Sequence, residues 1–66
     1  MDYRFRDVFE FQEKYPTQEQ REEQLLQMDC EEIMHLAHSC GNLTGAAYYG
    51  RFANLARERE EKESRP

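Results

Sequence analysis

A short break between two helical patterns most constrains what this chain can fold into. Residues 25–40 and residues 43–59 each space their apolar side chains as an amphipathic helix does. Gly41 is predicted to end the first helix in the left-handed conformation, because glycine has no Cβ to clash there. Asn42 or Thr44 can cap the next helix by accepting hydrogen bonds from its free N–H groups. Two helices joined so tightly are predicted to fold back on each other as a helical hairpin.

The length of 66 residues allows one small domain, residues 1–66. A chain this short buries only about 60% of the surface that it exposes when unfolded, so its stability is marginal. The sequence lacks the stretch of about 20 apolar residues that a membrane-spanning helix needs. Its charged start does not resemble a secretory signal. We therefore expect a soluble protein in a reducing compartment, the cytoplasm.

Charge is unevenly distributed along the chain. The net charge is −5, with −1 on residues 1–16, −5 on residues 17–40 and +1 on residues 41–66. An acidic surface repels the phosphates of nucleic acids. A solvated helix face is the simplest interpretation of the acidic segment, and a nucleic-acid mimic or a site for a basic partner is the alternative.

The N-terminal segment, residues 1–16, is rich in aromatic side chains. Its apolar residues are Tyr3, Phe5, Val8, Phe9, Phe11 and Tyr15. Part of this pattern has helical spacing and part alternates as in a strand. We therefore expect either a short helix from about Asp2 to Lys14 or an extended arm packed on the hairpin. Pro16 should end the helix, because the residue before a proline avoids helical geometry.

Residues 17–40 are predicted to form one long acidic helix, since no Gly or Pro interrupts them. Thr17 and Gln20 have the spacing of a capping box, in which each side chain accepts a hydrogen bond from the backbone N–H of the other. An apolar stripe then advances in steps of four and three residues, as in a coiled-coil seam. Its members are Leu26, Cys30, Ile33, Ala37 and Cys40.

A second helix is predicted over residues 43–61, followed by a frayed tail at residues 62–66. One face carries Ala46, Gly50 and Ala53, and it is expected to pack on the first helix because small side chains let two backbones approach closely. The other face carries larger side chains, whose rings can fill a subunit interface. These are Tyr48, Tyr49, Phe52 and Leu55.

The fold class predicted is all-α, with more apolar surface than one hairpin of two long helices can bury. The simplest solution is a homodimer in which two hairpins form a helical bundle. A monomeric three-helix unit closed by the N-terminal segment is the alternative. The side chains that we expect at the interface are Leu26, Ile33, Ala37, Tyr48, Phe52 and Leu55.

The sequence carries no clear catalytic or cofactor-binding motif. Cys30 and Cys40 would lie about 15 Å apart along one helix, too far for a disulfide, and are expected to be buried free thiols. Glu31, His35 and His38 share one helix face and form a conceivable three-ligand metal patch. No fourth ligand has a fixed spacing to them, so we expect neither a metal nor another cofactor.

The same break also permits a helix-turn-helix interpretation of residues 33–52. Ala37 lies four positions before Gly41, and a polar cap begins the next helix, as in such motifs. The side chains that would face the DNA groove are Thr44, Tyr48, Tyr49 and Arg51. Basic side chains are few in this region, although DNA binding normally needs several phosphate contacts. A DNA-binding regulator is therefore the alternative prediction.

The whole chain resembles the small early proteins of lambdoid bacteriophages that are encoded between the exonuclease and excisionase genes. The resemblance rests on the all-helical pattern, the Glu/Gln/Arg-rich stretch Gln18–Gln24 and the charged end Arg57–Arg65. It implies a non-enzymatic accessory protein that modulates host physiology or phage development by binding a host or phage protein in the host cytoplasm. We therefore predict a small acidic protein–protein interaction module.

Overall fold

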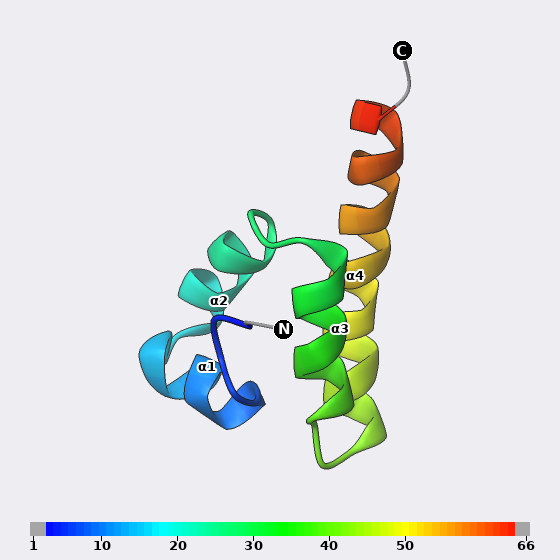
Figure 1. The fold of residues 1–66 in the computed structure, drawn as a ribbon. Coiled ribbons are helices and arrows are strands. Elements are labelled where there is room, and N and C mark those ends of the chain that lie inside the picture. Colours follow the sequence, from blue (N-terminus) through cyan, green and yellow to red (C-terminus); the bar gives the residue numbers. More distant parts are fainter. Residues whose placement is uncertain (1–2, 65–66) are drawn as a thin grey trace.

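The computed structural model describes residues 3–64 of the chain. Over this range the chain forms four helices and no strand, which confirms the all-α fold class (Figure 1). The helices are α1 (Val8–Lys14), α2 (Gln18–Leu25), α3 (Cys30–His38) and α4 (Leu43–Ser64). None of them is long and apolar enough to cross a membrane, as far as the described residues extend.

The N-terminal segment combines the two conformations that its sequence left open. Residues 3–7 form an arm without regular secondary structure, and α1 begins only at Val8 because the Asp7 side chain caps it by accepting from the Glu10 N–H at 3.0 Å. The helix ends at Lys14, directly before Tyr15 and Pro16, as the proline predicts. The predicted start at Asp2 lies outside the described residues.

The single helix predicted over residues 17–40 is wrong, because the chain turns at residues 26–29 and forms two helices. The capping box of Thr17 and Gln20 is confirmed, and α2 starts there. A second cap explains the break: the Asp29 carboxylate accepts from the Glu32 N–H at 2.9 Å and starts α3 afresh.

The connection from α3 to α4 has the predicted length and N-cap, but Gly41 does not have the predicted conformation. The Asn42 side chain accepts from the Gly45 N–H at 2.7 Å and caps α4, as expected. Gly41 does not adopt the predicted left-handed conformation, since no residue from 3 to 64 has a positive φ. The chain leaves α3 through Ser39 in a right-handed conformation instead.

Helices α3 and α4 lie side by side over the length of α3, and α1 and α2 cover the other side of α3 (Figure 1). The face of α4 that turns inward carries Tyr49, Ala53 and Ala56. This corrects the predicted division into a small-residue face and an aromatic face, because Tyr49 is buried whereas a Cβ at Gly50 would meet nothing within 4 Å.

The N-terminal segment completes the core. Phe5, Val8 and Phe11 are buried together with side chains from the three other helices. The Phe11 ring meets those of Phe5 and Tyr49 edge to face, with centroids 5.1 and 6.0 Å apart. The helical side chains that share this core with them are Leu25, Ile33, Leu36, Ala37, Tyr49, Ala53 and Ala56.

Helix α4 continues beyond its predicted end. Residues 62–64 are helical rather than frayed, while Arg65 and Pro66 lie outside the described residues. The C-terminal turns extend past the other helices (Figure 1). Side chains from Glu60 to Glu63 are exposed there, so much of this end of α4 is not covered by the rest of the chain.

Candidate functional site

The six side chains predicted at an interface divide into two groups. Ile33 and Ala37 are buried in the core of the single chain and are not available to a partner in this fold. Leu26 and Leu55 are 55% and 50% exposed. Tyr48 and Phe52 are partly buried and pack against the core. The four outer residues, Leu26, Tyr48, Phe52 and Leu55, are called the α2–α4 face below.

Contacts between α2 and α4 hold this face together. The Tyr48 hydroxyl donates a hydrogen bond to the Glu22 carboxylate at 3.2 Å, and the Tyr48 ring meets the Phe52 ring edge to face at 5.4 Å. The Arg59 guanidinium donates to the carbonyl oxygens of Leu26 and Met28. Leu55 lies one helical turn before Arg59, so it is on the side of α4 that meets the end of α2.

Burial raises the pKa of the Tyr48 hydroxyl above its ordinary value of 10.0, and the charge of Glu22 raises it further. The hydroxyl is therefore protonated at neutral pH and acts as the donor in its hydrogen bond to Glu22. Tyr48 also borders an open hollow on the outside of α4. The residues that line this hollow are Leu43, Thr44, Ala47, Tyr48 and Arg51.

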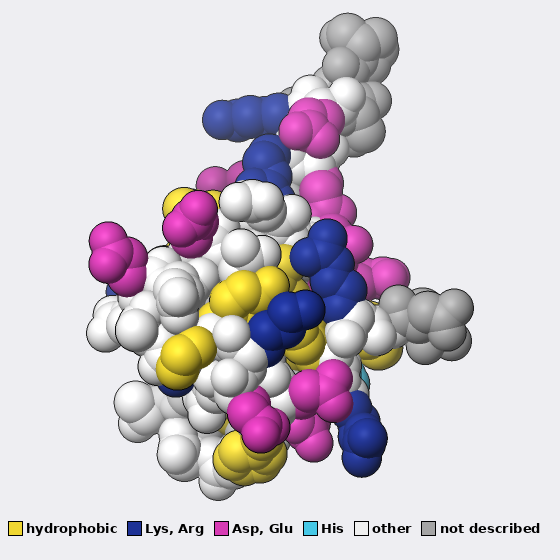
Figure 2. Space-filling model, turned by 90° about the vertical axis from the view of Figure 1, so that its left-hand side faces the viewer, with side chains coloured by type: hydrophobic (Ala, Val, Ile, Leu, Met, Phe, Trp, Pro, Cys, Tyr) yellow, Lys and Arg dark blue, Asp and Glu magenta, His cyan; other side chains and the backbone are white. Residues whose placement is uncertain are grey.

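On the side of the molecule formed by α1, α2 and the arm, basic side chains cover part of the apolar surface. Figure 2 shows hydrophobic side chains there in separate patches, with Lys and Arg side chains lying across those near the centre. The Lys14 ammonium lies 6.0 Å from the centroid of the Phe5 ring. The cation and its stem shield part of the apolar surface from water, while Phe9 on α1 remains 64% exposed.

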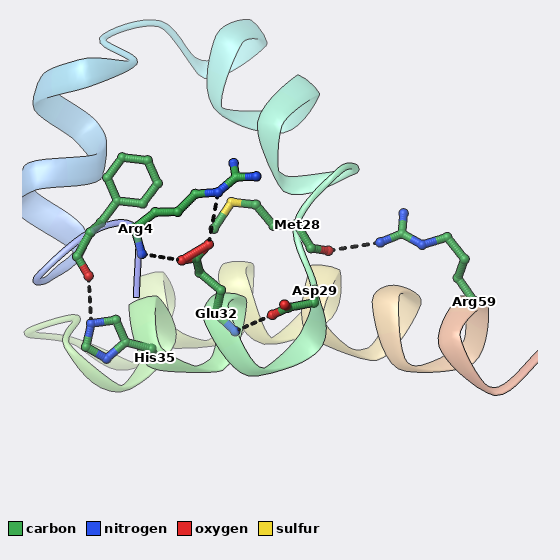
Figure 3. A network of polar contacts seen from close by, with 7 residues as sticks. Arg4, Met28, Asp29, Glu32, His35 and Arg59 are labelled. Carbon is green, nitrogen blue, oxygen red and sulfur yellow. Dashed lines mark hydrogen bonds and ion pairs between the residues drawn. The ribbon is translucent and has the colours of Figure 1, made fainter. Parts of the chain in front are cut away.

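Three polar side chains of α3 fix the arm, and the sequence pattern did not reveal them as a set. They are Glu32, His35 and Ser39, which lie on one side of α3 at steps of three and four residues. Glu32 is only 8% exposed and accepts from the Arg4 N–H at 2.7 Å, with the Arg4 guanidinium 3.7 Å away (Figure 3). Ser39 accepts from the Val8 N–H at 2.8 Å.

His35 has a structural role in this network. Its Nε2 lies 3.0 Å from the carbonyl oxygen of Phe5 (Figure 3). It also lies 2.7 Å from the carbonyl oxygen of Arg6. Carbonyl oxygens only accept, so Nε2 carries a hydrogen and donates to both. The Tyr3 ring stacks on the imidazole with centroids 4.2 Å apart. The imidazole therefore binds the arm through one nitrogen and one ring face.

The other candidate sites from the sequence do not assemble. No group of three His, Cys, Asp or Glu side chains within residues 3–64 is placed to hold a metal ion, so Glu31, His35 and His38 do not form a three-ligand cluster. Cys30 and Cys40 are free thiols and only partly buried. Burial raises the pKa of the Cys40 thiol above its ordinary value of 9.0, which is the opposite of nucleophile activation.

The residues of the helix-turn-helix interpretation are only partly accessible. Thr44 and Arg51 are exposed, but Tyr49 is buried and Tyr48 is bound to Glu22. Figures 1 and 3 both show α3 and α4 running alongside each other, whereas the two helices of a helix-turn-helix motif cross at a steep angle. The arrangement of α3 and α4 therefore differs from that of a helix-turn-helix motif (Figure 1).

Comparison with protein-family models, curated proteins and solved structures finds no match to this chain.

Proposed function

We propose that this chain is a non-enzymatic protein–protein interaction module that binds a partner through the α2–α4 face. The observation that carries the proposal is that Leu26 and Leu55 are half exposed on two segments that the Tyr48–Glu22 and Arg59–Leu26 hydrogen bonds bring together. Covering the exposed half of each leucine would contribute about 1 kcal/mol. Aromatic side chains at the centre of such a surface are typical of binding hot spots.

The resemblance to early proteins of lambdoid phages supports a partner protein from the phage or its host. We propose an accessory protein that acts in the host cytoplasm and modulates host physiology or phage development by binding a host or phage protein. Its mechanism would be occlusion or bridging of the partner by a helical surface. Self-association into a homodimer through α4 belongs to the same proposal.

Affinity capture from bacterial lysate, with the chain immobilised, tests the proposal. The wild-type chain is compared with a Leu26→Asp/Leu55→Asp double variant, and Leu43→Asp serves as the matched control because Leu43 is 89% exposed and lies outside the α2–α4 face. We expect a protein that the wild type and the control retain and the double variant loses. Equal retention by all three chains would refute the assignment of the surface.

A mobility-shift assay with duplex DNA at modest salt separates the DNA-binding alternative from this proposal. The net charge of −5 predicts no shifted complex. A salt-sensitive complex that is lost in the Arg51→Ala variant would instead support the helix-turn-helix interpretation.

A further inference from the structure

A regular row of side chains runs along α4 outside its buried face. The row advances from Thr44 in steps of four, three, four, three and four residues, so it forms a continuous seam along the helix. Five of its six members are exposed, and Tyr48 is partly buried. Leu55 and Tyr48 also belong to the α2–α4 face. The members of this outer seam are Thr44, Tyr48, Arg51, Leu55, Glu58 and Lys62.

At the centre of the outer seam, a basic and an acidic side chain flank Leu55 on opposite sides. Two antiparallel copies of this pattern bring opposite charges together. Arg51 lies about 6 Å before Leu55 along the helix axis, and Glu58 lies about 4.5 Å after it. A two-fold axis through Leu55 therefore places Arg51 opposite the partner subunit's Glu58, and the reverse pair follows by symmetry. A parallel pair of helices would set like charges against each other.

We propose that the outer seam binds a second copy of this chain, with the two α4 helices antiparallel and crossing near Leu55. The proposal deepens the proposed function, because it names the occupant of a surface that includes Tyr48 and Leu55. Leu55 and the partner's Leu55 form the apolar centre, flanked by two symmetric ion pairs between Arg51 and the partner's Glu58.

The length and position of α4 support this pairing. The helix spans Leu43–Ser64, so an axis near Leu55 lies close to its middle and the two copies overlap over most of their length. The C-terminal turns, which extend past the rest of the chain (Figure 1), would lie beside the first half of the partner's α4. Antiparallel helix dipoles attract each other. Residues 41–66, which include α4, carry a net charge of only +1, so the two α4 helices repel each other little.

Sedimentation of the full chain at concentrations up to about 1 mM tests the pairing, because association with a dissociation constant near 1 mM is then detectable. The variants are Arg51→Glu, Glu58→Arg and the double reversal, each checked by circular dichroism for an intact helical fold. We expect each single reversal to weaken the dimer by about tenfold or more, since it brings like charges together at both symmetric pairs. The double reversal restores both pairs and should return the dissociation constant to within about threefold of wild type.

Two matched controls separate the seam from general effects. Arg57→Glu makes the same charge change on an exposed residue next to Glu58 but outside the seam, and should leave the dimer unchanged. Leu55→Asp should abolish the dimer, whereas Leu43→Asp should not.

A wild-type chain that stays monomeric throughout this range would overturn the inference, as would a double reversal that fails to restore the dimer. Neither result would refute the proposed function, because capture that depends on Leu26 and Leu55 is measured separately. A chain that dimerises as described but captures nothing would support the inference and reduce the proposed function to self-association.

Discussion

At the scale of single residues, the buried carboxylate of Glu32 links the arm to α3. It accepts from the Arg4 N–H and faces the Arg4 guanidinium, so its charge is offset by a backbone donor and a cation. A carboxylate this well buried is stabilising only while such partners remain in place. The arm in turn carries Phe5 into the core, so the loss of one polar anchor is expected to disturb apolar packing as well.

Replacing Glu32 with Ala should lower the free energy of unfolding by about 1–3 kcal/mol, because it leaves the Arg4 N–H without its acceptor. Urea denaturation followed by circular dichroism measures the change. Glu31→Ala is the control, since Glu31 is exposed and adjacent, and it should change stability by less than about 0.5 kcal/mol. Equal effects of the two substitutions would show that the Arg4 contact does not stabilise the fold.

Tyr48 makes the stability of the fold depend on pH in the alkaline range. Its pKa is raised in the folded state by burial and by Glu22, so the folded chain favours the protonated hydroxyl. The resulting stabilisation is fully present below the ordinary pKa of 10.0 and is lost as pH rises through the folded-state pKa. Tyr48→Phe removes the titrating group together with its hydrogen bond.

We therefore expect Tyr48→Phe to be less stable than wild type by about 1 kcal/mol or less at pH 8. The difference should shrink or reverse above pH 10, because only the wild type then loses the protonated hydroxyl. Urea midpoints of both chains at a series of pH values measure this convergence. Two curves that stay parallel across the range would contradict the raised pKa.

At the scale of elements, the sequence predicts a helix end well where a capping residue or a proline within one turn marks it. The capping box at Thr17, the stop before Pro16 and the Asn42 cap each depend on residues within one turn, and all three are present. The break at residues 26–29 was missed because no Gly or Pro marks it. The spacing of Asp29 and Glu32 before an apolar run was the available signal, since an N-cap residue followed three positions later by Glu is a common helix start.

The corner between α2 and α3 also depends on a distant element, which no local pattern reveals. Arg59 donates to the carbonyls of Leu26 and Met28, and the Glu60 carboxylate accepts from the Cys30 N–H at 2.9 Å. A cation thus binds the end of α2 and an anion binds the start of α3, each as the helix dipoles favour. The fifth turn of α4, which carries Arg59 and Glu60, therefore fixes where the two shorter helices meet.

Arg59→Leu should cost about 1–2 kcal/mol of unfolding free energy, because charged hydrogen bonds to two carbonyls are lost. Hydrogen exchange should accelerate first at the Gln27 and Met28 amides, which bond across the same turn. Arg57→Leu is the control on an exposed neighbour and should leave exchange at this turn unchanged. If both variants exchange alike, Arg59 does not stabilise the corner.

At the scale of the whole molecule, the N-terminal segment changes how much apolar surface is left for a partner. The sequence predicted an excess of apolar surface on a two-helix hairpin, yet Phe5, Val8 and Phe11 cover α3 and α4 within one chain. Contacts between residues 5–11 and residues 33–56 follow no sequence periodicity, so the sequence could not reveal that the N-terminal segment fills this part of the core. A dimer would therefore form through the outer side of α4 rather than by filling a gap in the core.

A single aromatic side chain at the junction of the elements should decide whether the chain folds at all. Phe11 is fully buried and meets rings from the arm and from α4. Phe11→Ala should cost about 3–5 kcal/mol, whereas the total stability of a domain of this length is roughly 3–10 kcal/mol. We expect loss of most helical circular dichroism near room temperature, or a single broad transition at much lower urea.

Phe9→Ala removes the same number of atoms from the same helix, but Phe9 is 64% exposed, so the variant should unfold within about 1 kcal/mol of wild type. The two substitutions differ only in whether the ring belongs to the shared core. If Phe11→Ala kept α3 and α4 folded while only α1 was lost, the arm and α1 would be an accessory to an independent helix pair. Cooperative loss of all four helices is expected because each contributes side chains to the one core that Phe11 joins.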